Sequence, residues 1–363
     1  MSTNLDIIPI NNWIETEGFP LIICGPCSAE NYNDLIQVAT DVAVIPHVKI
    51  FRAGIWKPRT RPDGFEGVGS IGLQWLKDIK SQTGLKTTVE VANPSHIEQC
   101  LANDVDVMWI GARTVGNPFS MQELAEALKG VDIPVMIKNP LNADLKLWIG
   151  AFERMNMVGI KKLVAIHRGF YAYDAKPYRN APMWELPIEL KRLVPDLPVI
   201  CDPSHIAGNR ELLSLISQKA LDLEMEGLMI EVHPNPDKAL TDAKQQITPD
   251  VFSKLLSSLI IRKEKGSNEF ESKLEELRAV IDGIDDELMR ILARRMLVVS
   301  EMGLYKKQNN ITILQLKRWN DVINDRIIKA DKLGLTKDFL EKILTIIHEE
   351  SIQIQTDIFN LSK

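Results

Sequence analysis

Eight short apolar runs, rich in β-branched residues, alternate with amphipathic segments between residues 21 and 261. The runs have the length of strands, and the segments between them have helical spacing and often end at glycine or before proline. The runs cover residues 21–24, 48–54, 86–92, 105–111, 134–139, 162–168, 198–204 and 228–234. A strand and a helix repeated eight times are typical of a (β/α)8 barrel, so the sequence predicts the α/β class.

An open, doubly wound sheet alternates in the same way, and the polar residues decide between the two folds. Nearly every run ends in a group that a hydrophobic core would reject: Cys27, Arg52, Lys57, Glu90, Arg113, Lys138, Arg168, Asp202, His205 and Glu231. In a barrel these positions converge on the carboxyl-terminal rim, where barrel enzymes carry their active sites. An open sheet would spread them along an edge.

The composition changes after residue 262, where a polar stretch leads into helical patterns. Leu274, Leu277, Ile281, Ile284, Leu288 and Ile291 alternate spacings of three and four, which is the period of a coiled-coil seam. A helix over 269–307 would be about 58 Å long, too long for a compact domain, so we expect it to pack against another chain. Two further helices fit 313–334 and 336–362. The predicted domains are therefore a barrel (1–262), a linker (263–268) and an all-helical domain (269–363).

Charge and composition exclude several classes of function. The formal charge is −6, which argues against a general nucleic-acid or membrane surface. No stretch approaches the roughly 20 apolar residues of a membrane span, and the first residues lack a leader pattern, so a cytoplasmic protein is expected. Four cysteines do not make a disulfide framework in that compartment.

Cys27 lies where the first predicted strand runs into a Gly-Pro turn, and three interpretations are open. It could be a core residue, half of a redox pair with Cys24, or a metal ligand. Cys27, His205, Glu231 and Asp242 could close on one ion. This mixed donor set suits a divalent metal such as Mn, Fe, Co or Zn better than Mg or Ca.

The cations at the strand ends form a second candidate group: Arg52, Lys57, Arg59, Arg113, Lys138 and Arg168. Long cations that share a pocket repel one another unless anions neutralise them, so such a pocket is expected to bind phosphates and carboxylates. The alternative is that each is an ordinary solvated surface charge.

Seven motifs in order carry a family resemblance: GPCS (25–28), RAG with KPRT (52–60), IGAR (110–113), IK (137–138), HRG (167–169), DPSH (202–205) and EVHP with ALTD (231–242). Together they resemble the short barrel type of 3-deoxy-D-arabino-heptulosonate 7-phosphate (DAHP) synthase. The resemblance implies a metal-assisted condensation of phosphoenolpyruvate with erythrose 4-phosphate.

The resemblance also implies roles for individual residues. Cys27, His205, Glu231 and Asp242 match the metal ligands. Arg113 and Arg168 match the site of the phosphoenolpyruvate phosphate, Arg52, Lys57 and Lys138 that of its carboxylate, and Arg59 with Thr60 the erythrose 4-phosphate site. Lys57 is the candidate proton donor, and Asp202 and Glu90 are expected to support the site. Related synthases that use another sugar phosphate are the rival interpretation.

Residues 274–296 and the positions that follow them resemble an all-helical chorismate mutase of three helices. The resemblance implies an intertwined homodimer that holds chorismate, and a higher homo-oligomer is left open. Arg278, Arg295 and Arg318 match the arginines around a dicarboxylate, Lys306 and Gln355 the donors to the ether oxygen, and Ser351 a carboxylate contact. Gln315 and Trp319 stand where the family often has acidic residues that face the substrate hydroxyl.

The expectation for the whole chain is a bifunctional enzyme of aromatic biosynthesis. Its helical domain is also expected to mediate feedback inhibition of the barrel. The alternative is a helical domain that regulates or dimerises the protein without mutase activity. His47, His96 and His348 are expected on the surface.

Overall fold

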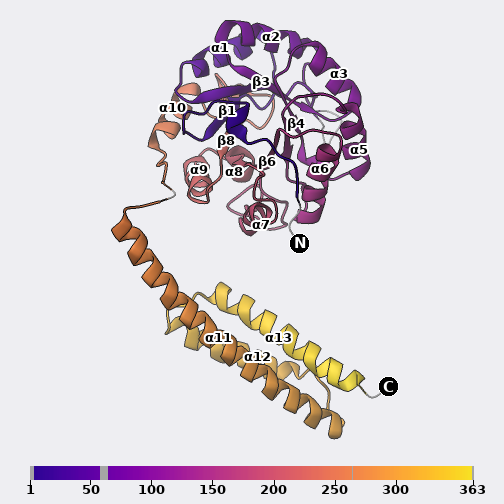
Figure 1. The fold of residues 1–363 in the computed structure, drawn as a ribbon, viewed down its shortest axis with the longest axis vertical. Coiled ribbons are helices and arrows are strands. Elements are labelled where there is room, and N and C mark those ends of the chain that lie inside the picture. The colour runs from indigo at the N-terminus through magenta and orange to yellow at the C-terminus, as the bar shows by residue number, and fades with distance from the viewer. Residues whose placement is uncertain (1–3, 58–63, 264, 362–363) are drawn as a thin grey trace. The chain divides into compact units, whose positions relative to one another are not determined.

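A computed structural model describes residues 4–57, 64–263 and 265–361 of the chain. It divides into two compact units, Met1–Arg262 and Lys263–Lys363. Figure 1 shows a rounded α/β unit followed by three long helices. Each unit is described by itself.

The first unit is a closed parallel barrel, which confirms the predicted fold class. Its strands pair in chain order, and β1 closes the ring by pairing with β8. In the described chain these strands are β1 (Leu21–Gly25), β2 (Val48–Arg52), β3 (Lys86–Val91), β4 (Val107–Ile110), β5 (Val135–Lys138), β6 (Leu163–His167), β7 (Val199–Cys201) and β8 (Gly227–Glu231). The closing register places Gly25 beside Glu231, so the two carboxyl ends meet.

Helices connect the strands and surround them (Figure 1). They are α1 (Tyr32–Ala43), α2 (Ile71–Thr83), α3 (Pro94–Ala102), α4 (Ala112–Val115), α5 (Pro118–Ala127), α6 (Leu145–Met157), α7 (Glu185–Leu193), α8 (Pro203–Ala207), α9 (Leu213–Asp222) and α10 (Pro249–Ser258), with short 3-10 turns η1 (Ile10–Asn12) and η2 (Pro236–Lys238). Side-chain caps begin several of them, such as Asn31 for α1 and Thr248 for α10.

Two apolar clusters hold the barrel together. One lies between the strands and the surrounding helices, and the other fills the interior with alternate residues of the strands, among them Ile23, Trp109 and Met229. Ile10 and Ile14 of the amino-terminal segment belong to the interior cluster. Because side chains fill the interior, the barrel is a packed core and only its rim is available for chemistry.

β7 is shorter than its predicted range of 198–204. It ends at Cys201 because Pro203 lacks a backbone N–H and starts α8, while Asp202 caps that helix by accepting from His205 N at 3.1 Å. His205 therefore lies on a short helix beyond the strand, and Asp202 fixes its backbone.

The second unit has three helices, as predicted: α11 (Asn268–Gln308), α12 (Leu316–Asp331) and α13 (Lys337–Asn360). α13 packs against both of the others. Gly303 allows the closest approach, since a Cβ there would lie 3.0 Å from Ile358 Cδ1 and 3.1 Å from Gln355 Cγ.

α11 spans 41 residues, about 60 Å of helix, and most of its apolar residues are exposed in the single chain. Its buried residues in the described chain are Val299 and Gly303. Leu277, Ile281, Ile284, Leu288, Ile291, Val298, Met302 and Tyr305 are between 46% and 69% exposed. No helix among the described residues is long and apolar enough to cross a membrane.

Candidate active sites

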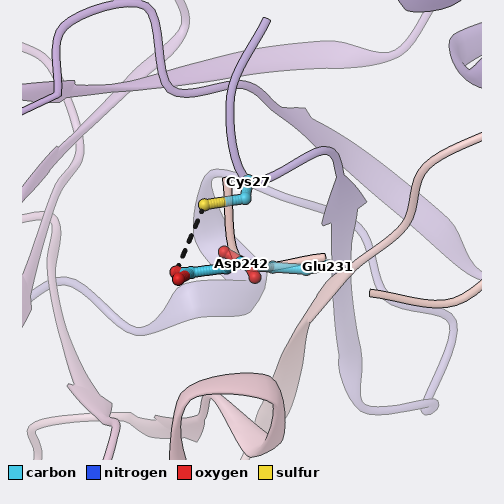
Figure 2. Close-up of side chains that lie close together, drawn as sticks. All are labelled: Cys27, Glu231 and Asp242. Atoms are coloured by element: carbon cyan, nitrogen blue, oxygen red, sulfur yellow. Dashed lines mark hydrogen bonds between the residues drawn. The ribbon is translucent and has the colours of Figure 1, made fainter. Parts of the chain in front are cut away.

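Cys27, Glu231 and Asp242 meet at the carboxyl-terminal mouth of the barrel (Figure 2). Cys27 follows β1, Glu231 ends β8, and Asp242 lies in the irregular segment after η2. A ligand atom from each lies within 4.8 Å of the others, and Cys27 Sγ donates to Asp242 Oδ2 at 3.5 Å. Gly25 permits this arrangement, because its φ of 141° suits glycine and a Cβ there would collide with the carbonyl oxygen of Arg52.

His205, the fourth predicted ligand, lies beside this cluster. Its Nε2 is 4.0 Å from Asp242 Oδ2, and its Nδ1 is 2.8 Å from Asp202 Oδ2 and 3.8 Å from Glu231 Oε1. Asp202 therefore faces one ring nitrogen while the other faces the cluster, as in a metal-ligating histidine whose second nitrogen is held by a carboxylate.

The cluster fits a divalent metal ion. A thiol, an imidazole and two carboxylates are ligand types for such an ion. Glu231 is completely buried, and its Oε1 accepts no hydrogen bond. Burial, with Glu231 nearby, raises the pKa of the Cys27 thiol to about 12, so an ion would have to displace its proton.

A cavity of about 290 Å³ opens beside the cluster and is lined mainly by charged groups. The predicted residues that line it are Cys27, Lys57, Glu90, Arg113, Lys138, Arg168, His205 and Asp242. Arg52 is buried close by, with Nη2 3.2 Å from Glu231 Oε1 and its guanidinium 5.0 Å from the centre of the Trp109 ring. Arg59 and Thr60 lie outside the described residues.

The cations of this cavity differ in what neutralises them. Lys138 pairs with Asp202 at 2.8 Å, and Lys57 donates to Cys27 Sγ at 3.2 Å. Burial would lower the pKa of Lys57, but Cys27 and Glu90 outweigh it, so its pKa is raised. Burial and the nearby arginines lower the pKa of Arg168 to about 10, although Asp202 opposes them. An anionic ligand would stabilise a cation that is buried beside other cations in this way.

Three residues that sequence reasoning missed complete the mouth. Arg179, in the loop after β6, lies with Nη1 3.1 Å from Asp242 Oδ1 and donates to Gln245 Oε1 at 2.6 Å. Gln245 and Gln246 follow Asp242 and contact the other groups of the cluster. The only signal in the sequence was position, since all three follow strands whose carboxyl ends meet at this rim.

The helical unit gathers a second polar group. Arg295 Nη1 on α11 donates to Ser351 Oγ on α13 at 2.7 Å, and Gln355 Nε2 donates to Ser351 O at 3.0 Å. Gln355 Oε1 is buried without a donor. Lys306 Nζ donates to Ile313 O at 2.6 Å. Arg295 is exposed in the single chain.

Arg278, Gln315 and Arg318 are exposed in the single chain. Arg278 pairs with Glu275 at 3.5 Å and lies on the same helix as Arg295, about 25 Å away along its axis. One chain therefore does not bring these two arginines to one small ligand.

His47, His96 and His348, which were expected on the surface, are only partly exposed. All three are half-buried, and each ring stacks on an aromatic side chain. His348 stacks on Trp319 with ring centres 3.7 Å apart. Burial and then Arg295 lower the pKa of His348, so this ring lies near the polar group of the helical unit.

Comparison with known proteins gives matches over both units. The family model described as DAHP synthetase I family matches residues 8–266, and that of chorismate mutase type II matches residues 277–356. The phospho-2-dehydro-3-deoxyheptonate aldolase of Thermotoga maritima is 29% identical over 242 residues, covering 67% of this chain and 69% of that protein. A 2-dehydro-3-deoxyphosphooctonate aldolase of Desulfatibacillum aliphaticivorans is 26% identical over 282 residues, covering 70% of this chain and 96% of that protein.

A solved structure resembles the barrel unit. The crystal structure of the Thermotoga maritima phospho-2-dehydro-3-deoxyheptonate aldolase (DAHP synthase) superposes with a TM-score of 0.61 and 30% identity, covering 66% of this chain and 68% of that one.

Proposed function

This chain belongs to the DAHP synthetase I family and carries a type II chorismate mutase domain, and from this premise we propose that it is a bifunctional enzyme. The barrel condenses phosphoenolpyruvate with erythrose 4-phosphate, and the helical unit converts chorismate to prephenate. The observation that carries the first activity is the Cys27, Glu231 and Asp242 cluster beside a cavity lined by lysines and arginines.

In the proposed reaction the cations hold both substrates. Arg113 and Arg168 bind the phosphate of phosphoenolpyruvate, and Arg52, Lys57 and Lys138 hold its carboxylate. Arg59 and Thr60 bind erythrose 4-phosphate. The lysine ammonium and the arginine forks suit these anions, and placing both substrates in one mouth removes much of the entropic cost of their encounter.

The methylene carbon of phosphoenolpyruvate forms a bond to the aldehyde carbon of erythrose 4-phosphate, whose oxygen gains a proton. Lys57, whose ammonium is protonated at neutral pH, supplies that proton. Water then adds to the carbon that bears the phosphate and loses a proton, and inorganic phosphate leaves as the ketone forms. A divalent ion such as Mn, Fe, Co or Zn, bound by Cys27, His205, Glu231 and Asp242, would polarise the aldehyde as a Lewis acid.

The choice of sugar phosphate is tested directly, because relatives named 2-dehydro-3-deoxyphosphooctonate aldolases also match the barrel. Phosphate release is measured with phosphoenolpyruvate and either erythrose 4-phosphate or arabinose 5-phosphate. We expect kcat/KM to favour erythrose 4-phosphate. A preference for arabinose 5-phosphate would reject this substrate assignment in favour of the rival one.

The mutase site is proposed to require two copies of the chain. Arg295 and Arg318 of one copy, with Arg278 of another, surround the chorismate dicarboxylate, and Ser351 contacts one carboxylate. Lys306 and Gln355 donate to the ether oxygen, and Gln315 faces the ring hydroxyl. The support is that Arg278 and Arg295 are about 25 Å apart along one helix, while the exposed apolar residues of α11 need a cover.

Arg295→Ala tests the mutase activity, with Arg294→Ala as the matched control one residue away. Loss of a charged contact worth about 3 kcal/mol slows chorismate loss about a hundredfold, whereas Arg294→Ala stays near the wild-type rate. If wild-type protein leaves chorismate unchanged, the helical unit acts only in regulation or dimerisation.

Feedback inhibition is proposed to pass through the same site. Prephenate or chorismate bound to the helical unit lowers the synthase rate of the barrel. The synthase rate of wild-type protein should fall at saturating prephenate, and that of Arg295→Ala should not. An unchanged wild-type rate rejects this proposal.

A further inference from the structure

The segment that carries Asp242 has no helix or strand to hold it. We call residues 239–246 the Asp242 segment; they run between η2 and the start of α10. Asp242 itself has a φ of 48°, in the left-handed region that non-glycine residues rarely occupy. Such a conformation persists only where the surroundings determine it. The contacts of this segment therefore decide where the Asp242 carboxylate lies.

Gln246 joins the Asp242 segment to the loop that carries Cys27. Its side chain is completely buried. Oε1 accepts from Cys27 N at 2.9 Å, and Nε2 donates to Thr241 O at 2.7 Å. One amide thus links the backbone of Cys27 to the residue that precedes Asp242.

Gln245 contacts the side chains of the cluster. It is 1% exposed, and its Nε2 donates to Glu231 Oε2 at 2.7 Å and lies 3.5 Å from Asp242 Oδ2. Its Oε1 accepts from Arg179 Nη1 at 2.6 Å. Gln245 therefore occupies Oε2 of Glu231, whereas Oε1 accepts no hydrogen bond and has the Arg52 guanidinium as its charged neighbour, with Nη2 3.2 Å away.

Two other contacts hold the same loops together. Ser28 Oγ and Thr241 Oγ1 share a hydrogen bond of 2.6 Å, and Leu240 N donates to Glu30 Oε1 at 2.7 Å. These contacts join neighbours of the cluster, whereas the glutamines contact Cys27, Glu231 and Asp242 themselves. A glutamine is needed because each site uses a donor and an acceptor at once, which neither glutamate nor methionine offers.

We propose that Gln245 and Gln246 are positioning residues of the metal site, an inference that rests on the proposed metal-dependent synthase function. Gln246 fixes the spacing between the Cys27 loop and the Asp242 segment. Gln245 orients the carboxylates of Glu231 and Asp242 toward a shared ion. Neither glutamine touches the substrates or the ion, so both act through the ligands.

The test is the affinity of the full-length, metal-free protein for Co²⁺. Gln245→Met and Gln246→Met keep the side-chain length and remove the hydrogen bonds. Gln122→Met is the matched control, because Gln122 is exposed on α5 and its side chain donates to Glu126. Titration is followed by the thiolate-to-cobalt absorption band, which requires Cys27 as a ligand. We expect the apparent Kd to rise about 10- to 100-fold in both variants and to stay unchanged in the control.

Gln246→Asn keeps the experiment decisive if loss of the buried amide unfolds the barrel. It retains donor and acceptor but is one methylene short, so its Kd should rise less than that of Gln246→Met. Folding is checked by tryptophan fluorescence. Folded variants that bind Co²⁺ within about twofold of wild type overturn this inference alone. A wild-type protein that does not bind Co²⁺ overturns the proposed metal-dependent function and this inference with it.

Discussion

His167, at the end of β6, is a completely buried ring among Phe170 and Trp184. Burial lowers its pKa to about 3, with a smaller lowering by Arg168 and opposing effects of Pro182 and Asp202. The unfolded chain has a histidine pKa of about 6.5. Below that pH the unfolded state binds the proton first, so the contribution of His167 to stability is complete above pH 6.5 and is lost as pH falls toward 3.

His167→Asn should therefore flatten the dependence of barrel stability on pH. Between pH 6.5 and 5 the protonation of His167 lowers the free energy of unfolding of the wild type by about 2 kcal/mol, and the variant lacks this loss. Urea unfolding followed by tryptophan fluorescence measures it, since six of the seven tryptophans lie in residues 1–262. His348→Asn, in the helical unit, is the control. It should leave the dependence of the barrel's free energy of unfolding on pH as in the wild type. Equal slopes for wild type and His167→Asn would contradict the prediction.

Gly111, directly after β4, gives a second prediction at the scale of a residue. A Cβ there would collide with the Glu90 carboxylate, which lines the cavity and helps to raise the pKa of Lys57. Because Glu90 can swing away, Gly111→Ala should change barrel stability by less than about 1 kcal/mol while lowering synthase kcat/KM about tenfold. Gly116→Ala is the control, since its Cβ would have 3.6 Å to its nearest neighbour. If Gly111→Ala and Gly116→Ala lose equal amounts of synthase kcat/KM, displacement of Glu90 does not explain the loss.

Individual residues were predictable where a strand end fixed them. Cys27 and Glu231 follow from the barrel because β1 and β8 are neighbours in register. Arg179 was missed because it lies in a long loop whose path no local pattern reveals. The stacking of His348 was not predicted because its partner, Trp319, belongs to another helix.

At the scale of elements, α11 determines how the helical unit associates. Ile284 and Leu288 are 59% and 51% exposed in the single chain and belong to its apolar stripe. Ile284→Lys should convert the proposed homodimer to monomers and reduce mutase activity about a hundredfold, because Arg278 no longer reaches the partner's site. Sedimentation velocity and chorismate loss measure the two effects.

Asp286→Lys is the control for this variant. Asp286 lies on the same helix outside the apolar stripe and should leave the dimer intact. A monomeric wild-type protein that retains full mutase activity would refute the shared site.

Element types were predictable from hydrophobic period, and their ends from capping chemistry. Ser267 and Thr336 cap α11 and α13 as their sequence contexts indicate. The end of β7 was not predicted: the predicted range ran on to residue 204, although the apolar run stops at Cys201 and the Asp-Pro pair that follows marks the start of α8. In such cases the backbone chemistry of the residues after the apolar run sets the end of the strand.

At the scale of the whole molecule, the two proposed activities differ in their need for metal. The cluster of possible metal ligands found in the described chain is Cys27, Glu231 and Asp242, in the barrel. Treatment with a chelator should lower the synthase rate at least about a hundredfold and leave the mutase rate unchanged. Mn²⁺ should restore the synthase. A synthase that keeps its rate in metal-free protein would refute the proposed cofactor.

The closure of the barrel has a consequence for how copies of this protein meet. Every described strand is bonded on both sides, so no row of free backbone groups offers itself to an incoming strand. Folded copies must recognise one another through side chains. The ladder between β7 and β8 has only two paired positions, Ile200 with Gly227 and Cys201 with Leu228. A barrel that opens during heating would separate first between β7 and β8. The unpaired backbone N–H and C=O groups exposed there would promote aggregation.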